Sequence, residues 1–168
     1  CHVGVVLVGV FRRREIIVKV AVSACLLGVR CRFDGRSKPS SVVQRFLEGH
    51  ECQVVKICPE VMGGLPIPHP PHEQRVLDGR VRVVDAEGND HTEAFETGAR
   101  AVCSLVCDSG CTHAILKAKS PSCGVGEVYD GTFSDALVPG DGVATKMLKE
   151  AGVVVATEKN FLERFGCE

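Results

Sequence analysis

Cysteine is the residue type through which this sequence most directly offers chemistry. Three of its ten cysteines come just after short apolar runs: Cys25 after VAVSA, Cys58 after QVVKI, and Cys123 in the loop after AILKAKS. Each lies close to glycine or proline, which hold a loop rigid or let the backbone approach a bulky group. Thiolates are soft ligands that select zinc, copper(I) or iron–sulfur clusters. A shared metal or cluster site and burial of each thiol as a small apolar side chain are equal alternatives for these three residues.

The spacing of the cysteines limits which metal or cluster they could bind. A structural zinc site favours four ligands in close pairs such as C-x-x-C, and the sequence contains no such pair. An iron–sulfur cluster held by three cysteines would leave one iron open to a substrate. Cys31, six residues after Cys25, is a fourth ligand, a reactive thiol or, by default, a packing residue. Cys103 and Cys107 share one face of an expected helix, where packing is the favoured explanation for them and for Cys111.

Strand-like and helix-like segments alternate along the chain. Three helices are predicted. The second of them is expected to begin at Asp90 or Thr92 as its N-cap and to end at Gly110. The strand-like segments are KVAVSACLLG, QVVKICPEVMGG, THAILKAKSPSCG and GVVVATEKN, and the helix-like segments are SSVVQRFLEGH, NDHTEAFETGARAVCSLVCDSG and DGVATKMLKEAG. This order predicts a mainly parallel sheet flanked by helices, a Rossmann-like three-layer α/β fold.

Between the second strand and the second helix, the sequence predicts an insertion. It consists of a proline-rich loop followed by a small β-hairpin, VLDGRVRVVDAEG. We expect one α/β domain over residues 19–168, preceded by an N-terminal extension, 1–18, to which we assign no function. Because ligands of open parallel sheets bind beyond the carboxyl ends of the strands, Cys25, Cys58 and Cys123 can converge there, with burial as separate packing residues the equal alternative.

Composition limits the class of protein. A chain of 168 residues with 45% apolar residues buries roughly 70% of its unfolded surface, enough for a full core without disulfides. A formal net charge of −1 without a basic run argues against stable nucleic-acid binding and favours small-molecule partners. The first apolar run is too short to span a bilayer, and arginines follow it. We therefore expect a cytoplasmic protein with reduced thiols and no membrane partner.

Four stretches together resemble a known family. VSACLLGVRCRFDG, CPEVMGGLPIPHPPHE, AILKAKSPSCG and VYDGTFSDALVPGDGVATKMLKEAG, in this order, are similar to the TudS-like thiouracil desulfidase family, formerly a domain of unknown function. The resemblance implies a [4Fe-4S] cluster held by Cys25, Cys58 and Cys123, whose open iron takes sulfur from a thiolated nucleobase such as 2-thiouracil. It also implies that the motif serine is Ser120 and that a nearby acidic residue is Glu60.

The implied chemistry is a hydrolytic desulfuration without a redox change. The open iron would polarise the thiocarbonyl, Glu60 would act as general base for water, and Ser120 would donate to the ring or relay a proton. Each residue also has a structural alternative: Glu60 stands in the first turn of a helix, and Ser120 precedes Pro121 in a turn. His69 stands where many relatives have arginine.

Two other functions remain open at this level. One is a sulfur carrier or thiolation enzyme that uses the same cluster, loaded by cluster-delivery proteins. The other is a non-enzymatic zinc-binding or redox-sensing module in which Cys31 completes a four-ligand site.

Overall fold

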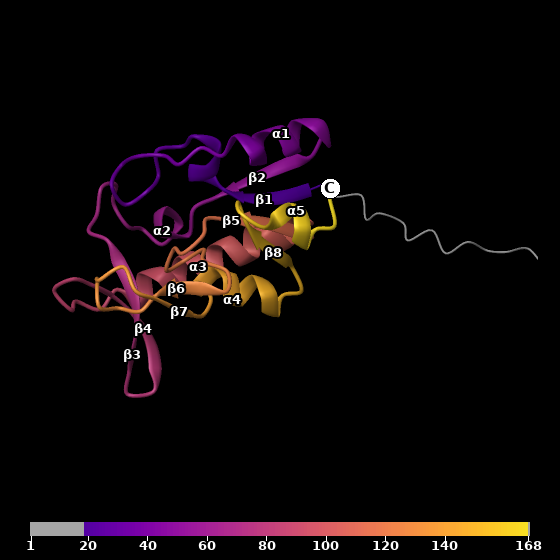
Figure 1. The fold of residues 1–168 in the computed structure, drawn as a ribbon. Coiled ribbons are helices and arrows are strands. Elements are labelled where there is room, and N and C mark those ends of the chain that lie inside the picture. Colours follow the sequence, from indigo (N-terminus) through magenta and orange to yellow (C-terminus); the bar gives the residue numbers. More distant parts are fainter. Residues whose placement is uncertain (1–18, 168) are drawn as a thin grey trace, which may run out of the picture.

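A four-stranded parallel sheet forms the centre of the molecule (Figure 1). The computed structural model describes residues 19–167, so the predicted extension 1–18 lies outside the described residues. The strand order is β2-β1-β5-β8, with β1 at Lys19–Ser23, β2 at Gln53–Ile57, β5 at His113–Leu116 and β8 at Val154–Thr157. The chain therefore has the predicted parallel α/β architecture.

The two central strands are apolar because both of their faces are covered. Four of the five residues of β1 and all four residues of β5 are buried. Val20 pairs in parallel with Val54 of β2 on one side and with His113 of β5 on the other. Such strands read as continuous apolar runs instead of alternating patterns, which is why the sequence predicted them.

Helices cover both faces of the sheet. On one face lie α1 (Ser41–Gly49) and α5 (Phe161–Arg164), whose Phe46 and Phe161 rings are 5.2 Å apart in an edge-on contact. On the other face, α3 (Thr92–Asp108) and α4 (Val143–Glu150) contribute buried residues to a second apolar cluster. The three-layer prediction is confirmed.

The start of α3 differs by one residue from the prediction. His91 occupies the N-cap position, and neither Asp90 nor Thr92 does. The Asp90 carboxylate nevertheless accepts a hydrogen bond from the backbone N–H of Thr92, at 2.8 Å. At the other end, Gly110 follows the helix with a left-handed φ of 75°, as expected of a C-terminal stop.

The insertion contains the predicted hairpin. Strands β3 (His72–Leu77) and β4 (Arg80–Asp85) pair in antiparallel register around Asp78 and Gly79, both of which have positive φ, as a two-residue hairpin turn requires. A second antiparallel pair, β6 (Glu127–Tyr129) and β7 (Leu137–Pro139), was not predicted.

The short helix α2 (Pro59–Met62) is fixed by direct backbone contact with α3. A Cβ added to Gly98 would lie 1.8 Å from the carbonyl oxygen of Pro59, and one added to Gly63 would lie 2.2 Å from that of Ala94. Only glycine allows this approach, so the segment that follows Cys58 has a position set by α3.

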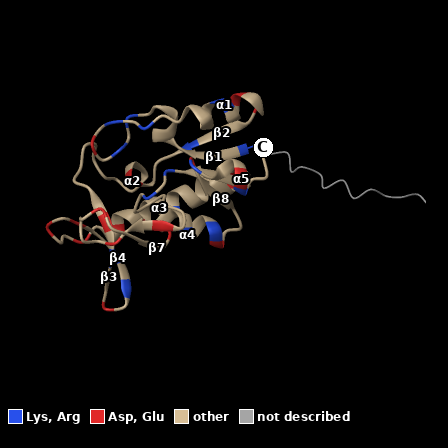
Figure 2. Cartoon of the chain, viewed as in Figure 1, with Lys and Arg blue, Asp and Glu red and all other residues tan. Residues whose placement is uncertain are grey.

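The described residues have mixed charges and no helix of membrane-spanning length. Lys and Arg are interspersed with Asp and Glu along the ribbon (Figure 2). No helix within residues 19–167 is long and apolar enough to cross a membrane.

Candidate active site

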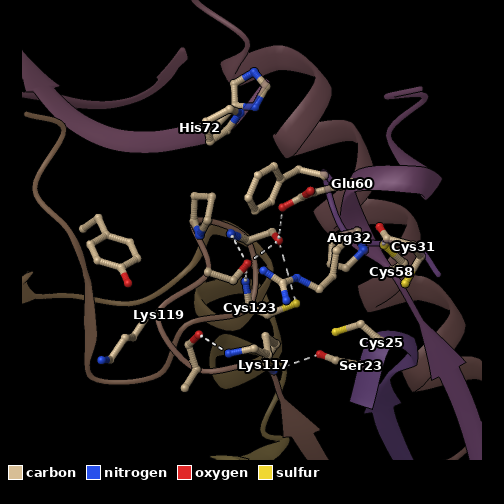
Figure 3. Close-up of a pocket in the computed structure, with 18 of the residues that line it drawn as sticks. Ser23, Cys25, Cys31, Arg32, Cys58, Glu60, His72, Lys117, Lys119 and Cys123 are labelled. Atoms are coloured by element: carbon tan, nitrogen blue, oxygen red, sulfur yellow. Dashed lines mark hydrogen bonds between the residues drawn. The ribbon is translucent and has the colours of Figure 1, made fainter. Parts of the chain in front are cut away.

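The three cysteines predicted to converge do so at the carboxyl edge of the sheet. Cys25 lies in the short 3-10 helix Ala24–Leu27, which follows β1, and Cys58 comes directly after β2. Cys123 lies in the loop after β5, the other neighbour of β1. All three line one cavity, and Figure 3 shows them around the same space.

Cys31 joins this group. Its side chain is buried and lines the same cavity, and the neighbouring thiols of Cys25 and Cys58 influence its pKa. The Cys58 thiol also donates to the backbone carbonyl of Cys31, at 3.7 Å. The default expectation of a packing residue therefore understated Cys31, which belongs to a cluster of four thiols.

The environment raises the pKa of three thiols in the cavity, those of Cys31, Cys58 and Cys123. The hydrogen bond with Cys25 is the main cause that raises the pKa of Cys31 to about 11. The hydrogen bond with Cys31, followed by burial, raises the pKa of Cys58, and burial raises the pKa of Cys123 to about 12. Because a metal binds the thiolate, loading the site must release protons.

Within residues 19–167, the other cysteines do not line the cavity. Cys111 is buried in the apolar cluster beneath α3 and α4, as the packing interpretation expected, and Cys103 packs against that cluster. Cys107 is exposed, so packing does not explain it. The four cysteines of the cavity, Cys25, Cys31, Cys58 and Cys123, form no disulfide.

The cavity has the size and lining of a small-molecule site. Its volume is about 470 Å³, within the usual range for ligand pockets. Besides the four cysteines, the lining includes the aromatic residues Phe33, Tyr129 and Phe133. A flat heterocycle can stack against such rings.

Glu60 and Ser120, the two residues expected to do acid–base work, both line the cavity. Ser122 connects them: its hydroxyl is 3.2 Å from Oε1 of Glu60 and 2.9 Å from the hydroxyl of Ser120. The second carboxylate oxygen of Glu60 lies 3.0 Å from Nε2 of His69. This hydrogen bond is the main cause that raises the pKa of His69.

Ser122 and His69 were not identified as functional candidates from the sequence. The available signal for Ser122 was its place beside Cys123 in SPSCG, and that for His69 was its place in the proline-rich loop. Neither signal shows that both side chains meet at Glu60, because His69 and Ser122 lie in separate loops and Glu60 lies in α2.

His72, at the start of β3, also lines the cavity. Its two ring nitrogens are buried and lack a hydrogen-bond partner among the described residues. Burial is the main cause that lowers its pKa, so the ring stays neutral at pH 7. In Figure 3 it lies at the far end of the site from Cys25.

The hairpin holds the segment that carries two of the aromatic residues. The Glu73 carboxylate accepts a hydrogen bond from the backbone N–H of Phe133, at 2.9 Å, and Nε of Arg75 donates to the carbonyl of Gly131, at 3.1 Å. The Gln74 side chain donates to the carbonyl of Pro121, at 3.0 Å. The inserted hairpin therefore supports the aromatic part of the cavity and also reaches the cysteine loop.

The loop that carries Cys123 is clamped against the start of α4. The backbone N–H of Ala144 donates to the carbonyl of Ser122, at 3.0 Å. A Cβ on Gly142 would lie only 2.4 Å from the carbonyl carbon and oxygen of Ser122. The absence of a side chain at position 142 thus lets the loop sit where it does.

The thiol arrangement does not suit a single ion. Zinc lies about 2.3 Å from each thiolate sulfur, so its ligands must gather closely around one point. Within residues 19–167, no three His, Cys, Asp or Glu side chains are arranged to hold one metal ion. Four thiols that line one larger space, three of them buried and that of Cys58 half-buried, instead suit a polynuclear group, in which different cysteines bind different metal atoms.

Comparison with known proteins agrees with this geometry. The family model described as 2-thiouracil desulfurase matches residues 20–160. This chain belongs to the 2-thiouracil desulfurase family. Its matched region covers every strand of the sheet, apart from Lys19 at the start of β1, and every cavity residue named above.

Two relatives show how far the similarity to this desulfurase family extends. The uncharacterized protein YbbK of Bacillus subtilis (strain 168) is 37% identical over 145 residues, which are 83% of this chain and 95% of YbbK. The solved structure of the [4Fe-4S]-dependent thiouracil desulfidase TudS superposes with a TM-score of 0.78 at 39% identity. That alignment covers 87% of this chain and 94% of TudS.

Proposed function

We propose that this protein is a desulfidase that hydrolyses the C–S bond of thiolated pyrimidines such as 2-thiouracil, and that it depends on a [4Fe-4S] cluster. The observation that carries the proposal is the convergence of Cys25, Cys58 and Cys123 on one cavity that also contains Glu60. Membership of the 2-thiouracil desulfurase family and the likeness to TudS support it.

The residues present fit the cluster. Cys25, Cys58 and Cys123 follow three adjacent strands and would hold it, and soft thiolates without disulfide bonds are the donors that iron–sulfur clusters use. Bound by three cysteines, the cluster supplies one iron with an open position, a Lewis acid for the sulfur of a thiocarbonyl. Cys31, beside Cys25 and Cys58, then remains a fourth, non-ligating thiol.

The chain's own groups supply the rest of the reaction. The rings of Phe33, Tyr129 and Phe133 bind the flat heterocycle and limit water in the cavity. Glu60 takes a proton from the water that attacks the thiocarbonyl carbon. The Ser120 hydroxyl donates a hydrogen bond to the ring of the substrate. Water supplies the oxygen and sulfide is the leaving group, so no electron is gained or lost.

The test is anaerobic reconstitution followed by iron and sulfide analysis and a 2-thiouracil assay that detects uracil and sulfide. Wild type should bind about four irons per chain and release uracil, and Cys25→Ala, Cys58→Ala and Cys123→Ala should each lose both properties. Cys111→Ala is the matched control, because Cys111 is as buried as Cys25 and Cys123 but does not line the cavity.

Two outcomes would count against the proposal. A variant of Cys25, Cys58 or Cys123 that keeps its four irons would remove that residue from the ligand set. A fully loaded wild type that fails to release sulfide from 2-thiouracil, but transfers sulfide to an activated tRNA, would instead identify a thiolation enzyme.

A further inference from the structure

A continuous chain of hydrogen bonds runs through the site from Ser120 to the carbonyl of Pro66. The Ser120 and Ser122 hydroxyls are 2.9 Å apart, and Ser122 Oγ is 3.2 Å from Oε1 of Glu60. On the other side, Oε2 of Glu60 is 3.0 Å from His69 Nε2, and His69 Nδ1 is 2.7 Å from the carbonyl oxygen of Pro66. Each carboxylate oxygen of Glu60 is therefore held by a different side chain.

The direction of the hydrogen bonds on the serine side follows from donor counts. Ser120 Oγ accepts from the backbone N–H groups of Ser122, at 3.2 Å, and Cys123, at 3.1 Å. Both lone pairs of Ser120 Oγ are then used, so its own proton points to Ser122. The Ser122 proton faces Glu60 at 3.2 Å and the Cys123 sulfur at 3.8 Å, and the carboxylate is the stronger acceptor. Ser122 thus donates to Glu60.

The direction on the histidine side is fixed by the backbone. A carbonyl oxygen can only accept, so Nδ1 of His69 carries a proton that it donates to Pro66. The backbone N–H of His69 donates to the carbonyl of Phe33, at 2.8 Å, and so fixes the part of the chain that carries the ring. Nε2 therefore meets Glu60 in one fixed orientation.

Burial makes these contacts effective. Ser122 is 2% exposed, and the side chains of His69 and Glu60 are 3% and 14% exposed. Water competes little for such groups, so the partners decide how the carboxylate is oriented. Without them, a glutamate side chain has three rotatable bonds, and the carboxylate would take several orientations in a cavity of this size.

We propose that Ser122 and His69 are positioning residues that hold the Glu60 carboxylate toward the substrate, Ser122 through Oε1 and His69 through Oε2. Ser122 also sets the direction in which the Ser120 hydroxyl points before substrate binds. The proposal rests on the function proposed above only in that it gives Glu60 a substrate to act on. The orientation of Glu60 itself is a property of this chain.

Four variants test it on reconstituted protein. Ser122→Ala removes one contact with Glu60, and His69→Leu removes the other. His69→Gln keeps an N–H at the position of Nε2 and serves as the conservative exchange. Ser104→Ala, at an exposed position of α3, is the matched serine control.

We expect Ser122→Ala and His69→Leu each to lower kcat by about ten- to a hundred-fold, the usual cost of a misplaced catalytic group. KM and the affinity for the product uracil should stay within about two-fold, because neither side chain is assigned a contact with the heterocycle. Iron content should stay at the wild-type level, and His69→Gln should recover most of the kcat lost in His69→Leu. A merely structural role would not separate the two His69 variants in this way.

Two results would overturn the proposal: loss of iron in Ser122→Ala, which would make Ser122 a support of Cys123, or equal kcat in His69→Gln and His69→Leu. Crystal structures of the variants give a readout independent of turnover. Glu60 should leave its wild-type rotamer in Ser122→Ala and His69→Leu and keep it in His69→Gln. If wild type is loaded but inactive on 2-thiouracil, the proposed function fails, and the rotamer of Glu60 still decides whether the two residues position it.

Discussion

The position of the Cys123 loop can be tested by adding a single methyl group. Gly142 lies against the peptide between Ser122 and Cys123, where a Cβ would be 2.4 Å from the Ser122 carbonyl carbon and 2.6 Å from Cys123 N. Ordinary contact begins near 3.4 Å, so Gly142→Ala requires a displacement of about 1 Å. The opposing atoms are backbone, and no side-chain rotation can relieve the contact.

A displacement of this size has two expected costs. Overpacking lowers the free energy of unfolding by about 1–3 kcal/mol. Moving Ser120 and Cys123 by about 1 Å relative to Glu60 and the other thiols is expected to lower kcat/KM for 2-thiouracil by about a hundred-fold. The measurements are urea unfolding and steady-state kinetics on reconstituted protein, with iron content recorded for each sample.

Gly49→Ala is the control for this experiment. Position 49 ends α1, and a Cβ there would meet no atom within 4 Å. The reasoning would be refuted if Gly142→Ala kept kcat/KM within about two-fold of wild type. Such a result would mean that the loop adapts without cost to the site, or that its position does not set the rate.

Three further results are expected. Cys31→Ser should retain about four irons per chain, and iron loss as large as in Cys58→Ser would instead identify Cys31 as a ligand. His72→Leu should raise the free energy of unfolding by about 1 kcal/mol, because it removes two buried nitrogens that lack a partner; a decrease in urea unfolding experiments would show that the nitrogens bind something in solution. Hydrogen bonds from Asn89 lower the pKa of Asp85 below its unfolded value, so its contribution is present above about pH 4 and is lost as the pH falls further. The difference in Tm between wild type and Asp85→Asn should therefore shrink on acidification from about pH 6 to about pH 3, and a difference that stays constant would contradict it.

Much of the fold was predictable because the signals are local. The buried strands are unbroken apolar runs, and the dipeptide Asp78-Gly79 marks the hairpin turn. The short pair β6 and β7 carries too little apolar patterning to stand out, since all three residues of β7 are exposed. The N-cap of α3 was misplaced because Asp90 bonds back to the helix without occupying the cap position.

The sequence could predict only those parts of the site that follow directly from the order of the strands. Parallel strands bring their carboxyl ends together, so Cys25, Cys58 and Cys123 could be placed from the sequence. The meeting of His69 and Ser122 at Glu60 depends on the paths of two loops, and those paths follow from contacts such as Gln74 with Pro121. No local pattern encodes such contacts.

The cysteines of the cavity and its aromatic residues Tyr129 and Phe133 are held by different parts of the fold, so the two groups can change independently among relatives. The thiol side is tied to the central sheet, where a shift in one strand would disturb its neighbours. The aromatic side rests on a hairpin and on the segment that contains Phe133, joined to each other by backbone and side-chain hydrogen bonds. The hairpin and the segment that contains Phe133 can therefore change together among relatives, so that the cavity accepts heterocycles of other shapes. The cysteines next to the central sheet would stay unchanged.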